Sequence, residues 1–311
     1  MKSPIVSIII VSYNTASLTE QCVTHALAST GFKLGQIEII VVDNNSTDNT
    51  PDILAKKYPS IKIIRNNKNL GFGAGNNLGV AHASSEYILL LNTDAFLKPD
   101  SLSKLLSVLV NNKDTLAVAP ELSYEDGRLQ QSVGYFPTLA RVVGWMWGLD
   151  KLPVIKSLFP TPYHFYDLSK YKNDLSPDWL MGACVLLRKD AYLSVAGFDE
   201  KIFMYGEEVE LFYRLKKKYP NQTVRLMPSV VVTHLGSSSS KASNTSSLIS
   251  ELHGIITFYN LHYPHLTWII KIIINLGVLI RVLVFSLIPS RRASARLYLG
   301  YLGQAKQGRV Q

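Results

Sequence analysis

The stretch Val6-Ser7-Ile8-Ile9-Ile10-Val11-Ser12-Tyr13-Asn14, near the start of the 311-residue chain, decides the type of fold. Its first six residues are almost all apolar and β-branched, and polar residues that favour turns follow them. A short apolar run of this kind is typical of a strand that is buried on both faces, as in a parallel sheet. The run is too short for a secretory signal peptide and lacks its flanking pattern, so we interpret it as a first strand.

Similar apolar runs recur through the first 120 residues, and stretches of helical character separate them. We predict strands at residues 5–11, 37–42, 61–64, 87–91 and 116–119. We predict helices at residues 16–29, 48–57, 74–83 and 99–111. Short buried strands that alternate with helices are the pattern of βαβ units. The pattern therefore predicts an α/β fold with a Rossmann-like, mostly parallel central sheet that is flanked by helices.

The remaining chain is less regular. Residues 120–178 are rich in Tyr, Phe, Trp, Pro and Gly, which predicts an irregular insertion. Regular structure is expected to resume with strands at 179–188, 223–227 and 230–234 and with helices at 189–195 and 207–219. The Ser-rich stretch 236–247 predicts a mobile loop. We expect one domain over residues 1–250, with halves 1–120 and 121–250, and a basic, apolar helical tail over residues 251–311.

Positive charge is concentrated in that tail. The chain has 32 Lys and Arg against 23 Asp and Glu, a formal net charge of +9. No acidic residue follows Glu251, whereas seven basic residues do, so 25 basic residues oppose 23 acidic ones in the rest of the chain. A nucleic-acid-binding protein usually spreads its basic residues over a folded face, so we expect no nucleic-acid partner. The two cysteines, Cys22 and Cys184, cannot form a disulfide framework, which favours a reducing, cytoplasmic compartment.

Residues 266–288 are apolar and long enough to span a bilayer, but Lys271, Asn275 and Arg281 interrupt them. On a helix these three side chains share an arc of roughly 140° with Thr267 and Ser286, and apolar residues occupy the rest. This favours a helix in the membrane interface over a tilted or re-entrant insertion or an oligomer contact. We therefore expect residues 266–296 to contact the inner face of the cell membrane, and we leave open whether the chain forms a homo-oligomer.

Polar clusters follow four of the predicted strands. They are Ser12-Tyr13-Asn14, Asp43-Asn44-Asn45-Ser46, Arg65-Asn66-Asn67 and Asn92-Thr93-Asp94. Ligands bind beyond the carboxyl ends of the strands in an open parallel sheet, so we expect the clusters to converge on one ligand site. Any one cluster alone is also explained by the turn residues with which strands ordinarily end.

The Asn92-Thr93-Asp94 cluster has the composition of a metal site. In an extended segment residues i and i+2 point to the same side, which places the Asn92 and Asp94 side chains near each other. A carboxylate and an amide oxygen suit Mg²⁺ or Mn²⁺, with ligand phosphates and water completing the coordination. The alternative is an Asx turn that caps the helix after Pro99.

These segments together resemble the family 2 glycosyltransferases, which have the GT-A fold and use nucleotide-sugar donors. The resemblance extends over residues 4–236 and is carried by residues 6–14, 42–48, 69–79, 92–94, 197–200, 205–210 and 234–237. It is strongest to the bacterial rhamnosyltransferase-like branch, which builds cell-surface polysaccharide.

The resemblance implies roles for individual residues. The residues implied to bind the nucleotide sugar are Ser12, Asn14, Asp43, Asn45, Asn76, Asn77 and Asn92, with Asp43 holding the base. Asp94 matches the last acid of the family's Asp-x-Asp metal motif, whose first acid is replaced by Asn92. His234 matches a histidine that approaches the metal or the diphosphate. Glu208 matches the general base, although acidic residues at the start of a helix are also favoured by its dipole, and Glu207 is an alternative base.

The resemblance thus implies an inverting, metal-dependent transferase that moves a sugar, with rhamnose as a candidate, from a nucleotide diphosphate to a lipid-linked or polysaccharide acceptor. Inversion requires a base on the face of the sugar opposite the leaving diphosphate, so Glu208 and Asp94 would bracket one hexose. One alternative is a sugar nucleotidyltransferase, but such enzymes carry a Gly-rich loop with Arg and Lys after the first strand, and residues 12–15 have neither. The other is a non-catalytic subunit of a glycan-assembly complex.

Overall fold

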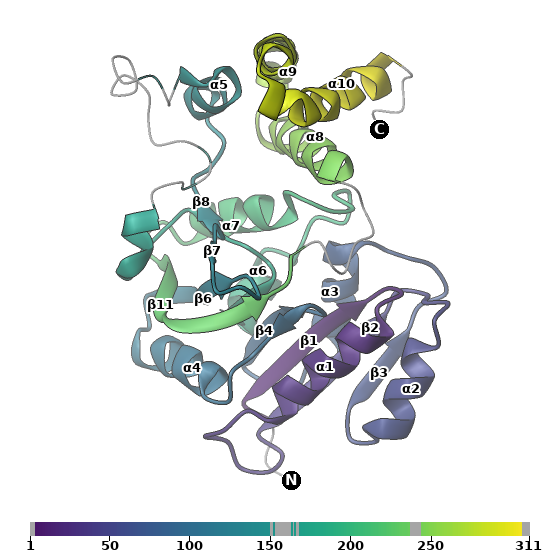
Figure 1. Ribbon diagram of the computed structural model, residues 1–311. Helices are drawn as coiled ribbons and strands as arrows, with labels where there is room; N and C mark the ends of the chain where they lie inside the picture. The colour runs from purple at the N-terminus through teal and green to yellow at the C-terminus, as the bar shows by residue number, and fades with distance from the viewer. Residues whose placement is uncertain are drawn as a thin grey trace. The chain divides into compact units, whose positions relative to one another are not determined.

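The computed structural model describes residues 4–149, 152, 163, 165, 168–236 and 244–306 (Figure 1). Within them the chain forms two compact units. Residues up to 133, 167–203 and 207–240 belong to the first, which we name the sheet unit. Residues 134–166, 204–206 and those from 241 onward belong to the second, the helical unit. The predicted division at residue 250 stays a prediction, and the core of the predicted Ser-rich loop, 237–243, lies outside the described residues.

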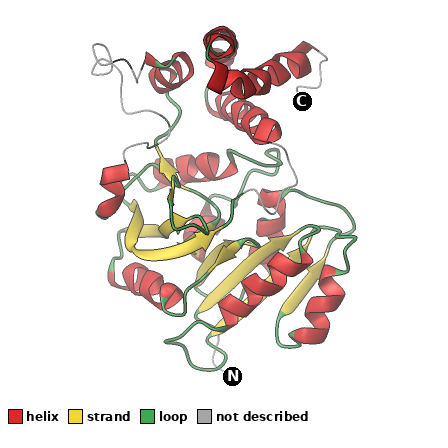
Figure 2. Ribbon diagram, in the orientation of Figure 1, coloured by secondary structure: helices red, strands yellow, loops and turns green. Residues whose placement is uncertain are grey.

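The sheet unit contains the predicted alternation of strands and helices (Figure 2). Its strands are β1 (Val6–Ser12), β2 (Ile37–Asp43), β3 (Lys62–Arg65), β4 (Tyr87–Asn92), β5 (Ala95–Phe96), β6 (Thr115–Ser123), β7 (Leu129–Gln130), β9 (Trp179–Leu180), β10 (Cys184–Arg188) and β11 (Thr223–His234). Its helices are α1 (Ala16–Leu27), α2 (Thr50–Lys57), α3 (Phe72–Ala81), α4 (Ser101–Asn111), α6 (Lys189–Ser194) and α7 (Glu207–Lys218), with a 3₁₀ turn at Leu168–Lys172. The short strand β8 (Val133–Gly134) lies where the two units meet along the sequence.

The central sheet has the strand order β3-β2-β1-β4-β10-β6-β11-β5, with β7 paired to β6. β1 is parallel to both β2 and β4, β2 is parallel to β3, and β6 is parallel to β11. β10 runs antiparallel to both of its neighbours, and β5 runs antiparallel to β11. The prediction of a mostly parallel sheet flanked by helices is confirmed.

Two strand predictions in the second half of this unit are wrong in detail. The predicted strand 179–188 is two strands, because the chain leaves the extended conformation at residues 181–183. The two predicted strands 223–227 and 230–234 form the single strand β11. Its register slips between Met227 and Val231, around Pro228, which has no backbone N–H to donate to the ladder.

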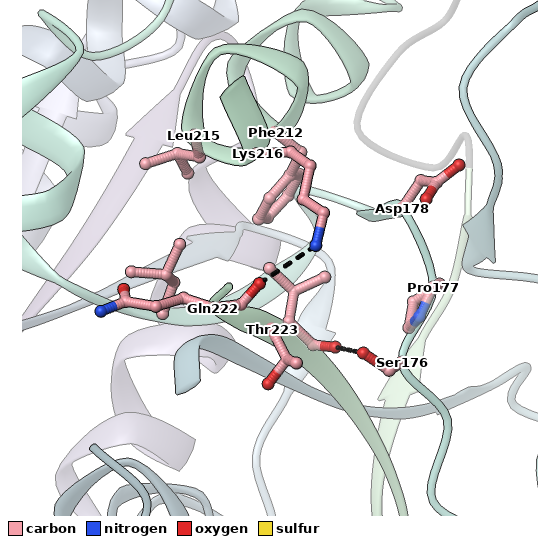
Figure 3. A pocket seen from close by; sticks show the side chains of 10 residues that line it. Ser176, Pro177, Asp178, Phe212, Leu215, Lys216, Gln222 and Thr223 are labelled. Carbon is pink, nitrogen blue, oxygen red and sulfur yellow. Dashed lines mark hydrogen bonds between the residues drawn. The ribbon is translucent and has the colours of Figure 1, made fainter. Parts of the chain in front are cut away.

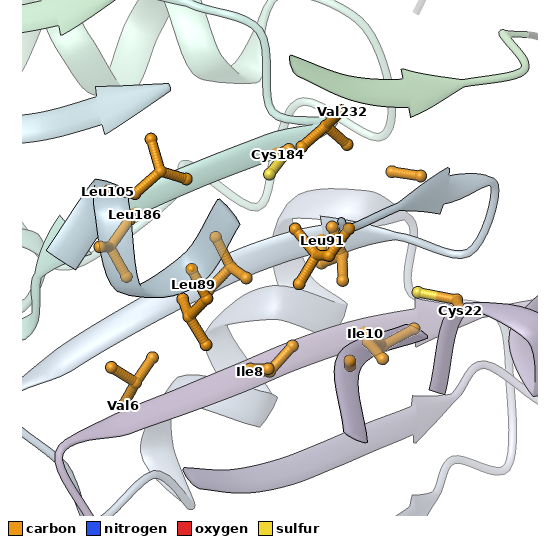
Figure 4. Close-up of a cluster of buried hydrophobic side chains, with 14 of the residues drawn as sticks. Val6, Ile8, Ile10, Cys22, Leu89, Leu91, Leu105, Cys184, Leu186 and Val232 are labelled. Carbon is orange, nitrogen blue, oxygen red and sulfur yellow. The ribbon is translucent and has the colours of Figure 1, made fainter. Parts of the chain in front are cut away.

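Side chains of β1 alternate between the two faces of the sheet. Ile8 and Ile10 belong to the core cluster that includes Cys22 of α1 and Leu105 of α4 (Figure 4). On the other face α3 lies so close that a Cβ added at Gly75 would sit 2.7 Å from Val11 Cγ1, and one at Gly79 would overlap Ile9. The run is apolar at successive positions because both faces are buried, which is the reason that it predicts the fold.

The helical unit contains α5 (Leu139–Trp147), α8 (Asn244–His262), α9 (Thr267–Leu287) and α10 (Arg292–Lys306), with 3₁₀ turns at Pro264–Leu266 and Pro289–Arg291. α9 packs against α5, α8 and α10. The Trp147 indole donates a hydrogen bond to the Ile273 carbonyl at 3.1 Å, and the lack of a side chain at Gly277 allows Met146 to approach.

Arg281 of α9 points into the helical unit, although the helical-wheel pattern groups it with exposed Lys271. Its guanidinium donates to the Met146 carbonyl at 2.9 Å, to the Trp145 carbonyl and to the Tyr298 hydroxyl. It also lies over the rings of Trp145 and Tyr298, 5.2 Å from each centroid. Both carbonyls belong to the last turn of α5, and the Trp145 carbonyl also accepts from the Gly148 amide at 3.3 Å. Arg281 supplies further donors to this end of the helix and so contributes to its cap.

Candidate active site

The carboxyl ends of three neighbouring strands meet at one edge of the sheet. The strand register places Ser12 of β1 opposite Asp43 of β2, and Val11 opposite Asn92 of β4. The polar clusters that follow these strands therefore begin side by side, as the sequence predicts. We name this edge the rim.

Asp94 lies at the rim, between β4 and β5, and is fully buried with 0% exposure. The pairing of β5 with β11 places His234 opposite Ala95, and the Leu235 amide donates to the Asp94 carbonyl at 3.0 Å. As a result, His234 Nε2 lies 3.3 Å from Asp94 Oδ1. The Asn92 side-chain nitrogen lies 3.4 Å from the same Nε2. The structure thus brings together the three residues that the sequence assigns to the metal and diphosphate.

The surroundings of Asp94 fit a divalent cation. Within the described residues neither of its carboxylate oxygens accepts a hydrogen bond. A buried carboxylate without such partners is costly, and a cation would offset that cost. The same residues contain no group of three His, Cys, Asp or Glu placed so that it could hold a metal ion, so Asp94 and His234 would need other ligands to complete a metal site. Donor phosphates and water are the usual complement for Mg²⁺ and Mn²⁺.

A buried thiol lies beside this cluster. Burial raises the pKa of Cys22 well above its ordinary value, and electrostatic interactions with Cys184 and Asp94 raise it further. The thiol therefore stays protonated and donates to the Asn92 carbonyl at 3.3 Å. Cys22 contributes to holding the backbone at Asn92 in place.

One carboxylate oxygen of Asp43 lacks a hydrogen-bond partner among the described residues. The side chain is buried, and Oδ2 accepts a hydrogen bond from the Ser46 amide at 3.1 Å. Its other oxygen, Oδ1, has no hydrogen-bond partner among the described residues. That oxygen could accept a donor group of a ligand, such as an N–H of a base. The role of Asp43 in base binding stays a prediction.

The neighbouring predicted residues shape the loop that carries Asp43. Asn14 has a φ of 54°, and its side-chain oxygen accepts from the Thr47 amide at 2.7 Å. Ser12 is buried and hydrogen-bonded to the hydroxyls of Thr15 and Thr19. Asn45 is exposed with a φ of 68°. Of the three, only Asn45 and Asn14 present surface to solvent, and direct contact with a nucleotide stays a prediction for each.

Asn76 and Asn77 lie in α3, the glycine-rich helix behind the rim. The buried Asn76 side chain donates to the Phe72 carbonyl of its own helix at 3.0 Å. The Asn77 amide donates to the Phe198 carbonyl at 3.0 Å and accepts from the Phe198 amide at 2.9 Å and the Tyr192 hydroxyl at 2.5 Å. Asn77 thus fastens the 197–200 loop to α3, and its contact with a nucleotide stays a prediction.

The helix that carries Glu208 is tied to segments that reach the rim. α7 packs against β9, and the Ala183 carbonyl, three residues beyond β9, accepts a hydrogen bond from the Asn92 amide at 2.9 Å. Phe203, four residues before α7, accepts through its carbonyl from the Phe72 amide at 3.1 Å. The segment before α7 is thus held at α3 through Phe203, and the strand against which α7 packs leads to the contact with Asn92.

The three acidic residues at the start of α7 differ in their surroundings. Glu210 is buried and pairs with Arg214, which also donates to the carbonyls of Val195 and Gly197, so it has a structural role. Glu207 is buried, and Glu208 is partly exposed. Partial exposure suits a group that must meet an acceptor, but the prediction that Glu208 and Asp94 bracket one sugar stays a prediction.

One residue at the site has no signal in the sequence. Gln130 of β7 lies 2.7 Å from His234 Nδ1 through its side-chain oxygen. It falls in the region of the chain that gives no regular pattern, and 104 residues separate it from His234. A contact so distant along the sequence has no local cue.

A separate pocket lies between α7 and the start of β11 (Figure 3). Phe212 and Lys216 of α7 line it together with Thr223, and its volume is about 70 Å³. This volume is too small for a nucleotide sugar, since ligand pockets typically hold about 300–1,000 Å³. Thr223 begins β11, whereas His234 ends it, so the pocket is at the far end of the strand from the rim.

Several known proteins with a similar sequence are glycosyltransferases. The family model described as Glycosyl transferase family 2 matches residues 7–174. The N-acetylglucosaminyl-diphospho-decaprenol L-rhamnosyltransferase of Mycobacterium tuberculosis is 28% identical over 197 residues, which cover 58% of this chain and 61% of the relative. Rhamnosyltransferase WbbL of Escherichia coli K12 is 31% identical over 154 residues, which cover 47% of this chain and 54% of the relative. The chain thus matches less than two thirds of the length of either relative.

A solved structure with a similar fold is the mannosyltransferase PcManGT from Pyrobaculum calidifontis in complex with GDP-Man and Mn²⁺. It has a TM-score of 0.62 and 14% identity, and the match covers 99% of this chain and 87% of the other. The sheet and its flanking helices therefore form a GT-A fold. With the family model matched over more than half of the chain, the protein belongs to glycosyl transferase family 2.

Proposed function

We propose that the protein is an inverting, metal-dependent glycosyltransferase that moves a sugar from a nucleotide diphosphate to a lipid-linked or polysaccharide acceptor. The observation that carries the proposal is the buried Asp94 carboxylate, which accepts no hydrogen bond from the described residues and faces His234. Membership of family 2 supports the reaction class, and the two rhamnosyltransferase relatives favour rhamnose as the sugar.

Asp94 and His234 would hold Mg²⁺ or Mn²⁺, with Asn92 beside them. When bound, the ion supplies positive charge that stabilises the diphosphate as it leaves. Asn92 replaces a carboxylate of the family motif, which leaves this site with one negative charge from the chain. We therefore expect the cation to bind weakly alone and tightly together with a nucleotide diphosphate.

The rim residues would bind the nucleotide. Asp43 offers the free Oδ1 to an N–H donor of the base, and Asn14 and Asn45 shape the loop around it. Ser12, Asn76 and Asn77 would support the residues of the rim, because their polar atoms are hydrogen-bonded within the sheet unit. Uridine, thymidine and guanosine all offer a ring N–H, so the rim chemistry fits all three.

Glu208 is the proposed general base, which takes the proton of the acceptor hydroxyl as that oxygen attacks the anomeric carbon. It lies in the first turn of α7, where the helix dipole interacts favourably with a negative charge. The nearby Glu207 is buried, which makes it the natural comparison.

The helical unit would bind the anionic surface of the cell membrane from its cytoplasmic side. α9 is long and apolar enough to cross a bilayer by length and composition. Exposed apolar side chains follow one another along it at helical spacing: Trp268, Ile272, Leu276, Leu279, Leu283 and Leu287. Exposed Lys271 on α9 and exposed Arg291, Arg292 and Arg296 after it add positive charge. An exposed apolar stripe flanked by basic residues favours a helix lying in the interface plane.

A transfer assay with the full chain tests the proposed reaction. The donors are UDP-, dTDP- and GDP-linked sugars with Mn²⁺, and the acceptor is prenyl-diphosphate-linked N-acetylglucosamine, the acceptor in the name of the mycobacterial relative. We expect transfer with inversion at the anomeric carbon. Glu208→Gln should lower the rate by a factor of about 10²–10⁴ and keep nucleotide binding, whereas Glu207→Gln should retain activity. The reverse pattern would move the base to Glu207, and the absence of transfer from every donor would contradict the proposed activity.

A further inference from the structure

We propose that Gln130 is a positioning residue that fixes the tautomer and orientation of His234, which leaves the Nε2 lone pair for the cation that the proposed function requires. This proposal rests on the proposed metal-dependent function. Gln130 lies on β7, opposite Leu122 of β6, and both Gln130 and His234 are buried.

The hydrogen-bond chemistry of this pair places a proton on His234 Nδ1. The Gln130 side-chain oxygen can only accept a hydrogen bond, and it lies 2.7 Å from His234 Nδ1. Nδ1 must therefore carry the proton, which leaves Nε2 of the neutral ring with a lone pair. Metal-ligating histidines commonly donate their second ring N–H in this way, which fixes the ring and strengthens the ligand nitrogen.

Nε2 lies near two polar atoms, the Asn92 side-chain nitrogen at 3.4 Å and one Asp94 oxygen. Nε2 lies 3.3 Å from Asp94 Oδ1, and that oxygen accepts no hydrogen bond from the described residues. The Nε2 lone pair and a carboxylate oxygen repel each other at this distance, and either a proton on Nε2 or a cation bound to both atoms relieves that repulsion. Gln130 therefore sets up the electrostatic arrangement that a divalent ion would relieve.

The backbone after β11 supports the orientation of Gln130. A Cβ at Gly236 would lie 3.0 Å from the Gln130 side-chain nitrogen, and Gly236 has a φ of 64°, which favours glycine. The chain thus leaves room for the amide nitrogen on the side away from His234, and the amide oxygen faces the ring.

The experiment first measures the tautomer in the metal-free full chain. Two-bond ¹H–¹⁵N correlation spectra distinguish the two neutral tautomers, and the spectrum of His234→Asn identifies the His234 signals. We expect the Nδ1–H form in the wild type and in Gln130→Glu, which keeps the acceptor, and a shift towards the other form in Gln130→Met. A wild-type His234 in the Nε2–H form would overturn the proposal, whether or not the protein transfers sugar.

The second measurement is Mn²⁺ affinity with UDP, dTDP or GDP present, from the electron paramagnetic resonance signal of free Mn²⁺. Gln130→Met should weaken Mn²⁺ binding about 10- to 100-fold, and Gln130→Glu should retain it. Gln222→Met, just before β11 at its far end, is the matched control and should bind as the wild type. Wild-type affinity in Gln130→Met would overturn the proposal. An absence of Mn²⁺ binding by the wild type would instead count against the metal dependence of the proposed function, which the tautomer measurement does not address.

Discussion

Arg281 and Lys271 carry the same charge on the same helix, but their surroundings predict opposite effects of mutation. Arg281 donates hydrogen bonds to the backbone carbonyls of Trp145 and Met146 of α5 and to the Tyr298 hydroxyl, whereas Lys271 is exposed. Changing either residue to Gln removes one positive charge from α9. Comparing the two variants therefore separates the contribution of packing within the helical unit from that of electrostatic attraction to a membrane.

The expected loss of stability in Arg281→Gln follows from its contacts. A hydrogen bond to a charged group contributes about 1.5–3 kcal/mol, and a cation–π contact about 0.5–1 kcal/mol or more. Because one side chain makes all of these contacts, and water can replace part of them, the effects do not add. We expect a loss of about 2–4 kcal/mol, which lowers the unfolding temperature by roughly 5–10 °C.

Lys271→Gln should leave the unfolding temperature unchanged and weaken membrane binding. A basic residue near an anionic surface contributes about 1 kcal/mol, so the partition coefficient should fall roughly five-fold. The assay is sedimentation with vesicles that contain phosphatidylglycerol, beside thermal unfolding in solution. Lys56→Gln, an exposed lysine on α2 of the sheet unit, is the control and should change neither quantity. If Arg281→Gln unfolds like the wild type and loses vesicle binding, Arg281 faces the lipid and our reasoning about its packing is refuted.

Two further predictions concern the sheet unit. Gly79→Ala would place a methyl group against Ile9 and should lower the free energy of unfolding by about 1–3 kcal/mol. Gly303→Ala is the control, because no atom lies within 4 Å of the new Cβ, and it should not lower this free energy. Equal stability of the two variants in urea unfolding would contradict the close packing of α3 on β1. Burial raises the pKa of Asp48, but hydrogen bonds from the Thr50 hydroxyl and from the amides of Ala16 and Thr50 outweigh it and lower the pKa below its ordinary value of 3.8. The stability that Asp48 provides should therefore be complete above pH 3.8 and be lost as the pH falls through the lower pKa of the folded state, and Asp48→Asn should flatten this part of the pH profile of the urea midpoint.

The sequence predicts the first half of the sheet unit well because its strands are buried on both faces. Every position of Val6–Ser12 must then be apolar or small. Short runs of this kind that alternate with helical segments are typical of buried parallel strands. The convergence of Asp43 and Asn92 follows from the same pattern, since neighbouring parallel strands end at one edge. In the second half, β10 runs antiparallel, and the break before it at residues 181–183 has no counterpart in hydrophobic periodicity.

The parts that could not be predicted depend on contacts between distant residues. Hydropathy places Arg281 on a polar face, because a helical wheel contains no information about the ends of α5 that this side chain caps. Gln130 reaches His234 across 104 residues of chain, and a single glutamine in an irregular segment gives no cue. Both residues are polar groups that satisfy partners elsewhere, and such pairs become visible only when the chain is folded.

The central claim is that Asp94, with His234, holds a divalent cation jointly with the diphosphate of the donor. The most direct measurement is the unfolding temperature of the full chain with Mn²⁺ alone, with UDP, dTDP or GDP alone, and with both, in the wild type, Asp94→Asn and the control Asp100→Asn, an exposed acid before α4. A ligand at about 100 times its dissociation constant stabilises by about 2.7 kcal/mol, so one nucleotide with Mn²⁺ should raise the temperature by roughly 5–10 °C. We expect that rise in the wild type and in Asp100→Asn and its loss in Asp94→Asn. The same rise in Asp94→Asn, or no dependence on Mn²⁺ in the wild type, would contradict the claim.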